Sequence, residues 1–210
     1  MIEFRADGVM CAWTAESSCV EPRYNALLAG IEAVEAIAGF QKRYAQFSHS
    51  LRIGIEDGMA YVGHAGGGGH FVYSIVGDCA NTAARIESLN KKLKTQLLVS
   101  ASVLAGVGGL LCRFVGDFRF VGKTEPLSIY EVVASDEQAS DAQIQLCQQF
   151  GAAMKVLSTG DWNKAGDMFA EILTEFPSDG PSRFHLERCR RCSAVPLVSD
   201  SPLVIHLDSK

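Results

Sequence analysis

The chain has 210 residues, of which 48% are hydrophobic and 20% are charged, and its net charge is -5. This balance supplies a sizeable core and excludes a wholly disordered chain. No run of Lys and Arg is present, which argues against nucleic acid as a partner, because phosphate backbones are bound through clustered positive charge. No apolar stretch approaches the roughly 20 residues that span a bilayer, and the acidic first residues do not read as a signal peptide.

The cysteines are seven in number and scattered along the chain. Cys189 and Cys192 form a lone pair with no second pair of cysteines, so zinc is weakly supported. Free thiols are the expected state, and they fit a reducing, cytoplasmic compartment.

The first half of the sequence predicts alternating strands and helices. The continuous apolar run 8–13 is typical of a strand covered on both faces. Apolar residues spaced by three and four predict a helix over 24–44. A strand over 51–55, the turn signal Asp57-Gly58 and a second strand over 59–62 predict a hairpin.

The middle of the chain continues this pattern. The four glycines 66–69 predict a flexible turn, with a backbone cradle for phosphates as the alternative. A strand over 71–76 follows, and Asp78 is expected to cap a helix over 79–92. A short strand over 97–99, a short helix capped by Ser100, and late strands over 113–121 and 129–133 complete the region. Strands joined by hairpins predict an α+β fold with a mixed or antiparallel sheet.

The composition becomes small and acidic at 134–140, and the pattern beyond is helical. Apolar stripes over 144–157 and 162–176 are joined by a Gly-Asp turn, and a third helix is expected over 181–191. The two-helix hairpin resembles one tetratricopeptide-like repeat, which needs a neighbour to pack against. We therefore divide the chain into residues 1–134, a helical extension over 135–192 and a loosely held tail over 193–210.

One helix presents residues suited to phosphate chemistry. Asn81 and Arg85 are four residues apart, so their side chains leave the same helix face. An amide beside a guanidinium suits a charged phosphoryl transition state. Taken alone, the pair fits an ordinary solvated helix face better, because polar residues four apart are common on helices.

The wider segment 73–88 makes the pattern specific. It runs strand, Gly-Asp, two residues, Asn, three residues, Arg, and in this it resembles the class III nucleotidyl cyclases, the adenylyl and guanylyl cyclase family. Segments 52–63, 98–100 and 121–131 resemble further family motifs in the same order, so the likeness covers 3–133. Several motifs in one register are more specific than a single match. The resemblance implies a ferredoxin-like sheet of the cyclase type with helices packed on it.

The resemblance also implies an activity. Such enzymes convert a purine nucleoside triphosphate into the 3′,5′-cyclic nucleotide and pyrophosphate. They work as head-to-tail homodimers, in which two aspartates of one subunit hold two Mg²⁺ or Mn²⁺ ions and the other subunit supplies the Asn and Arg. Any membrane contact would come through a region outside this chain.

The resemblance assigns roles to four residues. Asp7 matches the second metal-binding aspartate, and Asn81 matches the residue that orients the ribose. Arg85 matches the residue that stabilises the phosphoryl transition state. Lys123 matches a triphosphate contact, with a solvated turn lysine as the alternative.

Two further positions match those that select the base. Glu3 can accept hydrogen bonds from guanine, whereas the Ser74 hydroxyl donates or accepts and suits either purine. Related bacterial-type chains are mostly adenylyl cyclases. The resemblance therefore favours ATP slightly over GTP and leaves both open.

The sequence also departs from the family pattern. The first metal-binding aspartate, expected on a strand before Asp7, is absent from this chain, and Val121 and His70 stand where Lys and Arg are frequent. The leading hypothesis is a cyclase catalytic domain that is incomplete in this chain. The alternatives are a non-catalytic cyclase-like module that dimerises or regulates, and a helical interaction adaptor centred on 140–191.

Overall fold

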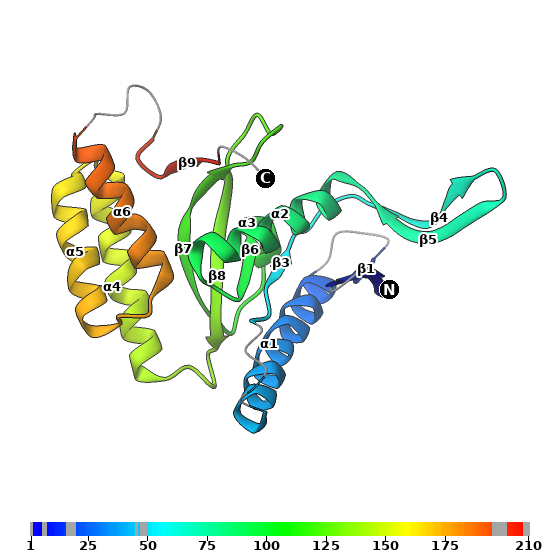
Figure 1. Cartoon of the computed structure of the whole chain (residues 1–210), viewed down its shortest axis with the longest axis horizontal. Helices are drawn as coiled ribbons and strands as arrows, with labels where there is room; N and C mark the ends of the chain where they lie inside the picture. The colour runs from blue at the N-terminus through cyan, green and yellow to red at the C-terminus, as the bar shows by residue number, and fades with distance from the viewer. Residues whose placement is uncertain are drawn as a thin grey trace.

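The computed structural model describes residues 2–5, 8–15, 20–44, 46, 50–194 and 201–207. Within this part of the chain, a five-stranded sheet is flanked by helices (Figure 1). β3 and β6 are parallel, β6–β8 and β8–β7 are antiparallel, and β7–β9 is parallel, so the expected α+β fold with a mixed sheet is confirmed. In sheet order the strands are β3 (Ile53–Ile55), β6 (Leu97–Ser100), β8 (Leu127–Ser135), β7 (Leu110–Arg119) and β9 (Val204–His206).

Helices cover both faces of this sheet. Leu98 of β6 points into a cluster with Ile86 of α2 and Phe150 of α4, whereas its neighbours Leu97 and Val99 point to α1. Alternate side chains of one strand therefore serve two cores, as the period of a strand requires. The helices are α1 (Val20–Arg43), α2 (Asp78–Leu93), α3 (Ala101–Leu104), α4 (Asp141–Ser158), α5 (Trp162–Glu175) and α6 (Gly180–Ala194).

The first two strands stand apart from the main sheet. β1 (Ile2–Arg5) and β2 (Gly8–Cys11) pair antiparallel in a two-stranded sheet of their own. The prediction that 8–13 forms a strand covered on both faces is wrong, since Val9 is 56% exposed. β2 pairs with β1 in a sheet of two strands, and three of its four residues are exposed.

A long hairpin, β4 (Tyr61–Gly67) and β5 (His70–Val76), projects from the body of the molecule (Figure 1). Gly68 and Gly69 have φ values of 62° and 86°, the left-handed conformation that a two-residue hairpin turn requires. The predicted turn at 66–69 is therefore confirmed. The predicted hairpin between 51–55 and 59–62 is wrong, because β3 pairs with β6 and β4 pairs with β5.

The helix α2 packs unusually closely on the edge strand β3. A Cβ atom at Gly54 would lie 2.2 Å from the Glu87 nitrogen and 2.4 Å from the Ala83 oxygen, so the approach depends on glycine. The Asn90 side chain adds a hydrogen bond from Nδ2 to the Ile53 carbonyl, at 2.9 Å. The helix that carries Asn81 and Arg85 is thereby fixed to the sheet.

The start of α2 differs from expectation. Gly77 is the N-cap residue and no side chain caps this end, whereas Asp78 is the first helical residue. The prediction that Asp78 caps the helix is therefore wrong, and its carboxylate is available for another partner. The short helix after Ser100 is present, although the Ser100 hydroxyl pairs with that of Ser102 at 2.7 Å instead of capping.

Three helices follow residue 140: α4 and α5 where the two apolar stripes predict them, and α6 where a third helix is expected. α4 begins with a capping box formed by Ser140 and Gln143. The likeness of α4 and α5 to a tetratricopeptide repeat stays a prediction. The expectation of a loose tail is wrong over 204–206, because this segment is strand β9 and Ile205 is only 6% exposed.

Among the described helices, none combines the length and the apolar character that crossing a membrane would require.

Candidate functional site

The site is built on α2 and on the turn that joins β7 to β8. Asn81 is exposed on α2, and Arg85 follows it one turn later, half-buried. Arg85 Nη1 donates a hydrogen bond to the backbone oxygen of Val121 at 2.8 Å. This contact joins Arg85 to the turn on which Lys123 lies.

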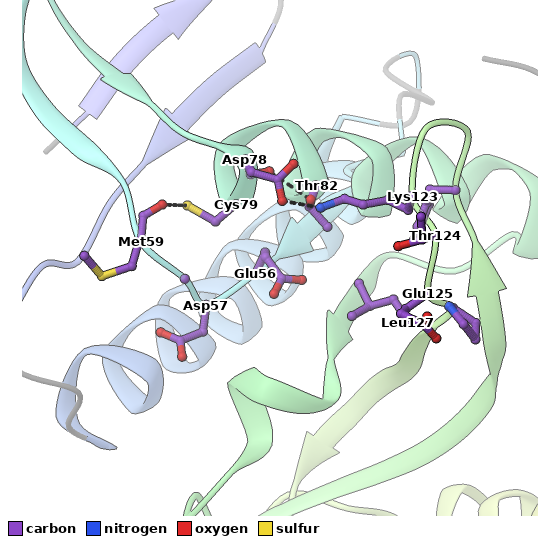
Figure 2. A pocket seen from close by; sticks show the side chains of 13 residues that line it. Glu56, Asp57, Met59, Asp78, Cys79, Thr82, Lys123, Thr124, Glu125 and Leu127 are labelled. Carbon is purple, nitrogen blue, oxygen red and sulfur yellow. Dashed lines mark hydrogen bonds and ion pairs between the residues drawn. The ribbon is translucent and has the colours of Figure 1, made fainter.

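The second cation of the site, Lys123, also contacts α2. Its ammonium forms an ion pair with the Asp78 carboxylate, and Figure 2 shows the lysine extending from its turn toward the start of the helix. The Lys123 backbone nitrogen closes the turn by bonding to the Phe120 oxygen at 2.9 Å. The side chains of Lys123 and Asp78 are 30% and 76% exposed, so water reaches this pair.

The two residues assigned to base selection lie in contact. Ser74 Oγ of β5 donates a hydrogen bond to Glu3 Oε2 of β1, at 3.0 Å, and both residues are half-buried. This bond links the β1–β2 sheet to the β4–β5 hairpin. The structure therefore brings Glu3 and Ser74 together, although they are far apart in the sequence.

Asp7, the residue assigned to the metal, lies outside the described residues, and so does the side chain of His70. Within the described part of the chain, no group of three or more His, Cys, Asp or Glu side chains could hold a metal ion.

A pocket of about 430 Å³ opens beside the ion pair (Figure 2). Burial raises the pKa of the Glu56 carboxyl, although Ser102 donates to its Oε1 at 3.1 Å. Acidic side chains outnumber the one lysine that lines the pocket, and Arg85 lies outside this lining. The charged residues that line the pocket are Glu56, Asp57, Asp78, Glu125 and Lys123.

Sequence reasoning missed the role of Asp78. It was expected to satisfy the backbone at the end of the helix, but its carboxylate faces Lys123 instead. The available signal was weak, because an acidic residue in the first turn of a helix is favourable without any specific partner. Only the return of the β7–β8 turn to α2 pairs the two residues.

No family model matches the chain. Among curated proteins, it is 32% identical to "Adenylate cyclase 1" of Rhizobium meliloti over 137 residues, which are 63% of this chain and 21% of that protein. It is similar to adenylate cyclases. The second example, "Adenylate cyclase, terminal-differentiation specific" of Dictyostelium discoideum, is 23% identical over 79% of this chain and 8% of that protein. The chain thus spans about a fifth or less of these relatives.

The fold has a counterpart among solved structures. The crystal structure of the guanylyl cyclase Cya2 superimposes with a TM-score of 0.51 and 24% identity, over 67% of this chain and 73% of that one. At this identity the likeness shows the fold alone. The chain is thus similar in sequence to adenylate cyclases and in fold to a guanylyl cyclase, whereas the ferredoxin-like detail of the sheet stays a prediction.

Proposed function

We propose that this chain is the catalytic part of a nucleotidyl cyclase, which converts a purine nucleoside triphosphate into the 3′,5′-cyclic nucleotide and pyrophosphate. The observation that carries the proposal is the convergence of Arg85 and Lys123 on the turn after β7. Asn81 lies one helical turn before Arg85. Two cations and an amide next to one turn suit a triphosphate that is cleaved at its α-phosphorus.

In this proposal each residue acts through ordinary charge and hydrogen bonding. The Arg85 guanidinium exchanges the neutral Val121 carbonyl for a phosphate oxygen, which is favourable because guanidinium and phosphate carry opposite charges and can form two parallel hydrogen bonds. Lys123 binds the triphosphate after release from Asp78. Asn81 orients the ribose, so that its 3′-oxygen attacks the α-phosphorus in line while pyrophosphate leaves.

The purine is the finer part of the proposal. The Glu3 carboxylate is an acceptor, and guanine offers N1–H and amino donors, so the contact between Glu3 and Ser74 is compatible with GTP. The named sequence relatives are adenylate cyclases, which favours ATP. We place ATP first, with GTP as the alternative, and offer both nucleotides in the assay.

The assembly belongs to the proposal as well. We assign the catalytic part to residues 1–134, the helical extension to 135–192 and the tail to 193–210, and we expect a head-to-tail homodimer. A Mg²⁺ or Mn²⁺ ion is assigned to Asp7 through the family resemblance alone. Each of the six cysteines that the structure describes is a free thiol, which fits the expected cytoplasmic location.

The test is a turnover assay of the purified chain with Mn²⁺, offering ATP and GTP separately and detecting the cyclic product. We expect product from one nucleotide. Arg85→Ala should lower kcat by roughly 100- to 1,000-fold, the range seen when a transition-state donor is removed. Arg190→Ala, which changes an exposed arginine of α6, should leave kcat unchanged.

Two results would count against the enzyme. One is the absence of cyclic product from either nucleotide, and the other is equal turnover of Arg85→Ala and Arg190→Ala. A non-catalytic cyclase-like module is the second candidate, since Val121 and His70 stand where Lys and Arg are frequent in the family that the chain resembles. It predicts self-association without turnover, which sedimentation of the same sample measures.

A further inference from the structure

The strand β9 lies beside the end of β7 that leads into the β7–β8 turn, where Val121 and Lys123 lie. The two strands run parallel, with Asp117 opposite Val204 and Arg119 opposite His206. The Asp117 nitrogen donates to the Leu203 oxygen at 3.1 Å, and the Leu207 nitrogen donates to the Arg119 oxygen at 3.3 Å. Figure 1 shows β9 crossing from the side of α6 to the sheet.

The surface of β7 leaves space for a side chain of β9 at Gly116. Gly116 of β7 has a φ of 134°, and a Cβ atom there would lie 2.7 Å from Ile205 Cδ1. Ile205 is 6% exposed and packs in the cluster that contains Val115 and Phe118. Because Gly116 has no side chain, the buried Ile205 side chain of β9 can pack directly against β7. The contact between the two strands is therefore closely packed.

An arginine of α6 binds the backbone of β9 and of the residues just before it. Arg188 Nη1 donates to the Pro202 oxygen at 2.5 Å, and Nη2 donates to the Val204 oxygen at 2.6 Å. Arg188 is 6% exposed, and its guanidinium carbon lies 5.2 Å from the Trp162 ring centroid. Hydrogen bonds from a buried charged group are strong and costly to lose, so Arg188 fixes the path of the chain before and within β9.

The helix that carries this arginine is itself fixed to the sheet. Asp179 accepts from Arg113 Nη2 of β7 at 2.6 Å, and it also caps the start of α6 by accepting from the Ser182 nitrogen at 2.9 Å. The path of contacts therefore runs from β7 through α6 and β9 back to the end of β7. The end of β7 is paired on both sides, with β8 and with β9.

The residue Arg119, whose carbonyl binds β9, ends β7 and is followed by the turn that holds Val121 and Lys123. A strand end that is paired on both edges moves less than one that is paired on one edge, and so does the turn that leaves it. The turn then meets α2 with Val121 and Lys123 at a fixed position.

We propose that β9 and Arg188 together form a brace that positions the turn 120–126 for the nucleotide, with Arg188 as a positioning residue. This inference rests on the proposed function, because it assigns the turn to triphosphate binding. Asn81 and Arg85 lie on α2, which is attached to β3 through the close approach at Gly54 and the Asn90 hydrogen bond. Loss of the brace therefore weakens nucleotide binding more than it slows the chemical step.

The test compares Arg188→Met with Arg190→Met in the full chain. Arg190 is exposed on the same helix. The two variants therefore have the same net charge, and only Arg188→Met loses the hydrogen bonds to the backbone of Pro202 and Val204. Hydrogen exchange of the peptide 117–126 is measured without nucleotide, and KM and kcat are measured with Mn²⁺ and ATP or GTP. In Arg188→Met we expect exchange about tenfold faster and KM about five- to tenfold higher, the effect of losing one or two charged hydrogen bonds. We expect kcat within about twofold of the parent, because the residues that act on the chemical step lie on α2.

A conservative variant separates positioning from general stability. Arg188→Lys keeps a cation and several donors, so KM should return most of the way to the parent value. If Arg188→Met does not fold, Arg188→Lys is compared with Arg190→Lys. We then expect slower hydrogen exchange and a lower KM in Arg190→Lys than in Arg188→Lys.

Several outcomes would overturn the brace. They are an exchange rate and KM equal to those of Arg190→Met, faster exchange without a change in KM, and a higher KM without faster exchange. If the parent chain forms no cyclic nucleotide, the proposed function fails by itself, and the positioning of a nucleotide turn fails with it. The exchange rates then still decide whether β9 restrains this segment.

Discussion

Two cationic groups of this molecule have similar partners and opposite surroundings. Arg113 of β7 binds Glu131 and Asp179 at 2.6 Å each, and its side chain is only 4% exposed. Lys123 pairs with Asp78 at the surface, where their side chains are 30% and 76% exposed. The first group joins α6 to the sheet, and the second lies in the candidate site.

Burial determines what each group can do. Burial raises the pKa of the Glu131 carboxyl even though Arg113 opposes this, so the charged network is stable only while its partners are complete. An exposed ion pair contributes about 1 kcal/mol or less and exchanges readily for another anion. The buried group is therefore structural, whereas the exposed one is free to give up Asp78 for a phosphate.

The largest effect that this comparison predicts is loss of the buried group. Arg113→Met leaves two carboxylates buried without their cation, so we expect a loss of about 3–5 kcal/mol in the free energy of unfolding. Arg52→Met removes an exposed partner of Glu87 and should cost less than about 1 kcal/mol. Urea denaturation of both variants measures the difference. Similar losses of unfolding free energy would contradict the view that burial makes the Arg113 group more important for stability than an exposed ion pair.

The next effect concerns pH and the histidine beside the buried group. Burial among aromatic rings lowers the pKa of His185 to about 4, from an ordinary value of 6.5. As the pH falls from 6.5 to 4, His185 becomes protonated in the unfolded chain but stays neutral in the folded chain. Stability should therefore be full above pH 6.5 and fall by up to about 3 kcal/mol across this window.

Substitution of the histidine sharpens this prediction. His185→Gln should flatten the fall in unfolding free energy between pH 6.5 and 4, whatever its effect at pH 7. His64→Gln, on the exposed β4 strand, should keep the slope of the parent. Unfolding midpoints at several pH values give both slopes, and an unchanged slope in His185→Gln would contradict the prediction.

The smallest effect concerns the exposed pair. Asp78→Asn removes the charge that holds Lys123, so the lysine meets the triphosphate without first losing a partner. We expect KM for the nucleotide to fall by about two- to fivefold, the worth of an exposed ion pair. Asp141→Asn is a matched control, because Asp141 is likewise the first residue of its helix. A KM that rises or stays at the control value would show that Asp78 does not compete with the substrate.

Local sequence patterns predicted much of the fold. The spacing of apolar residues located α1, α4 and α5, and the late strands predicted over 113–121 and 129–133 overlap β7 and β8. These features depend on neighbours within a few residues, which a sequence displays directly. The motif on α2 likewise placed Asn81 and Arg85 on one helix.

The pairings of distant segments were not predictable in this way. The chain itself does not show that β3 pairs with β6, that β9 joins β7, or that Asp78 faces Lys123. The contact between Ser74 and Glu3 spans 71 residues. Such contacts depend on how the packed layers come together, and no local periodicity encodes them.

By itself, the sequence determined which segments form helices and which residue types could handle a phosphate, because both follow from short-range spacing and side-chain chemistry. The tertiary structure decided which charges are buried and which stay exposed. It therefore decided that Arg113 joins α6 to the sheet, while Lys123 and its partner Asp78 stay at the surface. Burial is the physical reason, since the cost of removing a charge from water is set by everything packed around it.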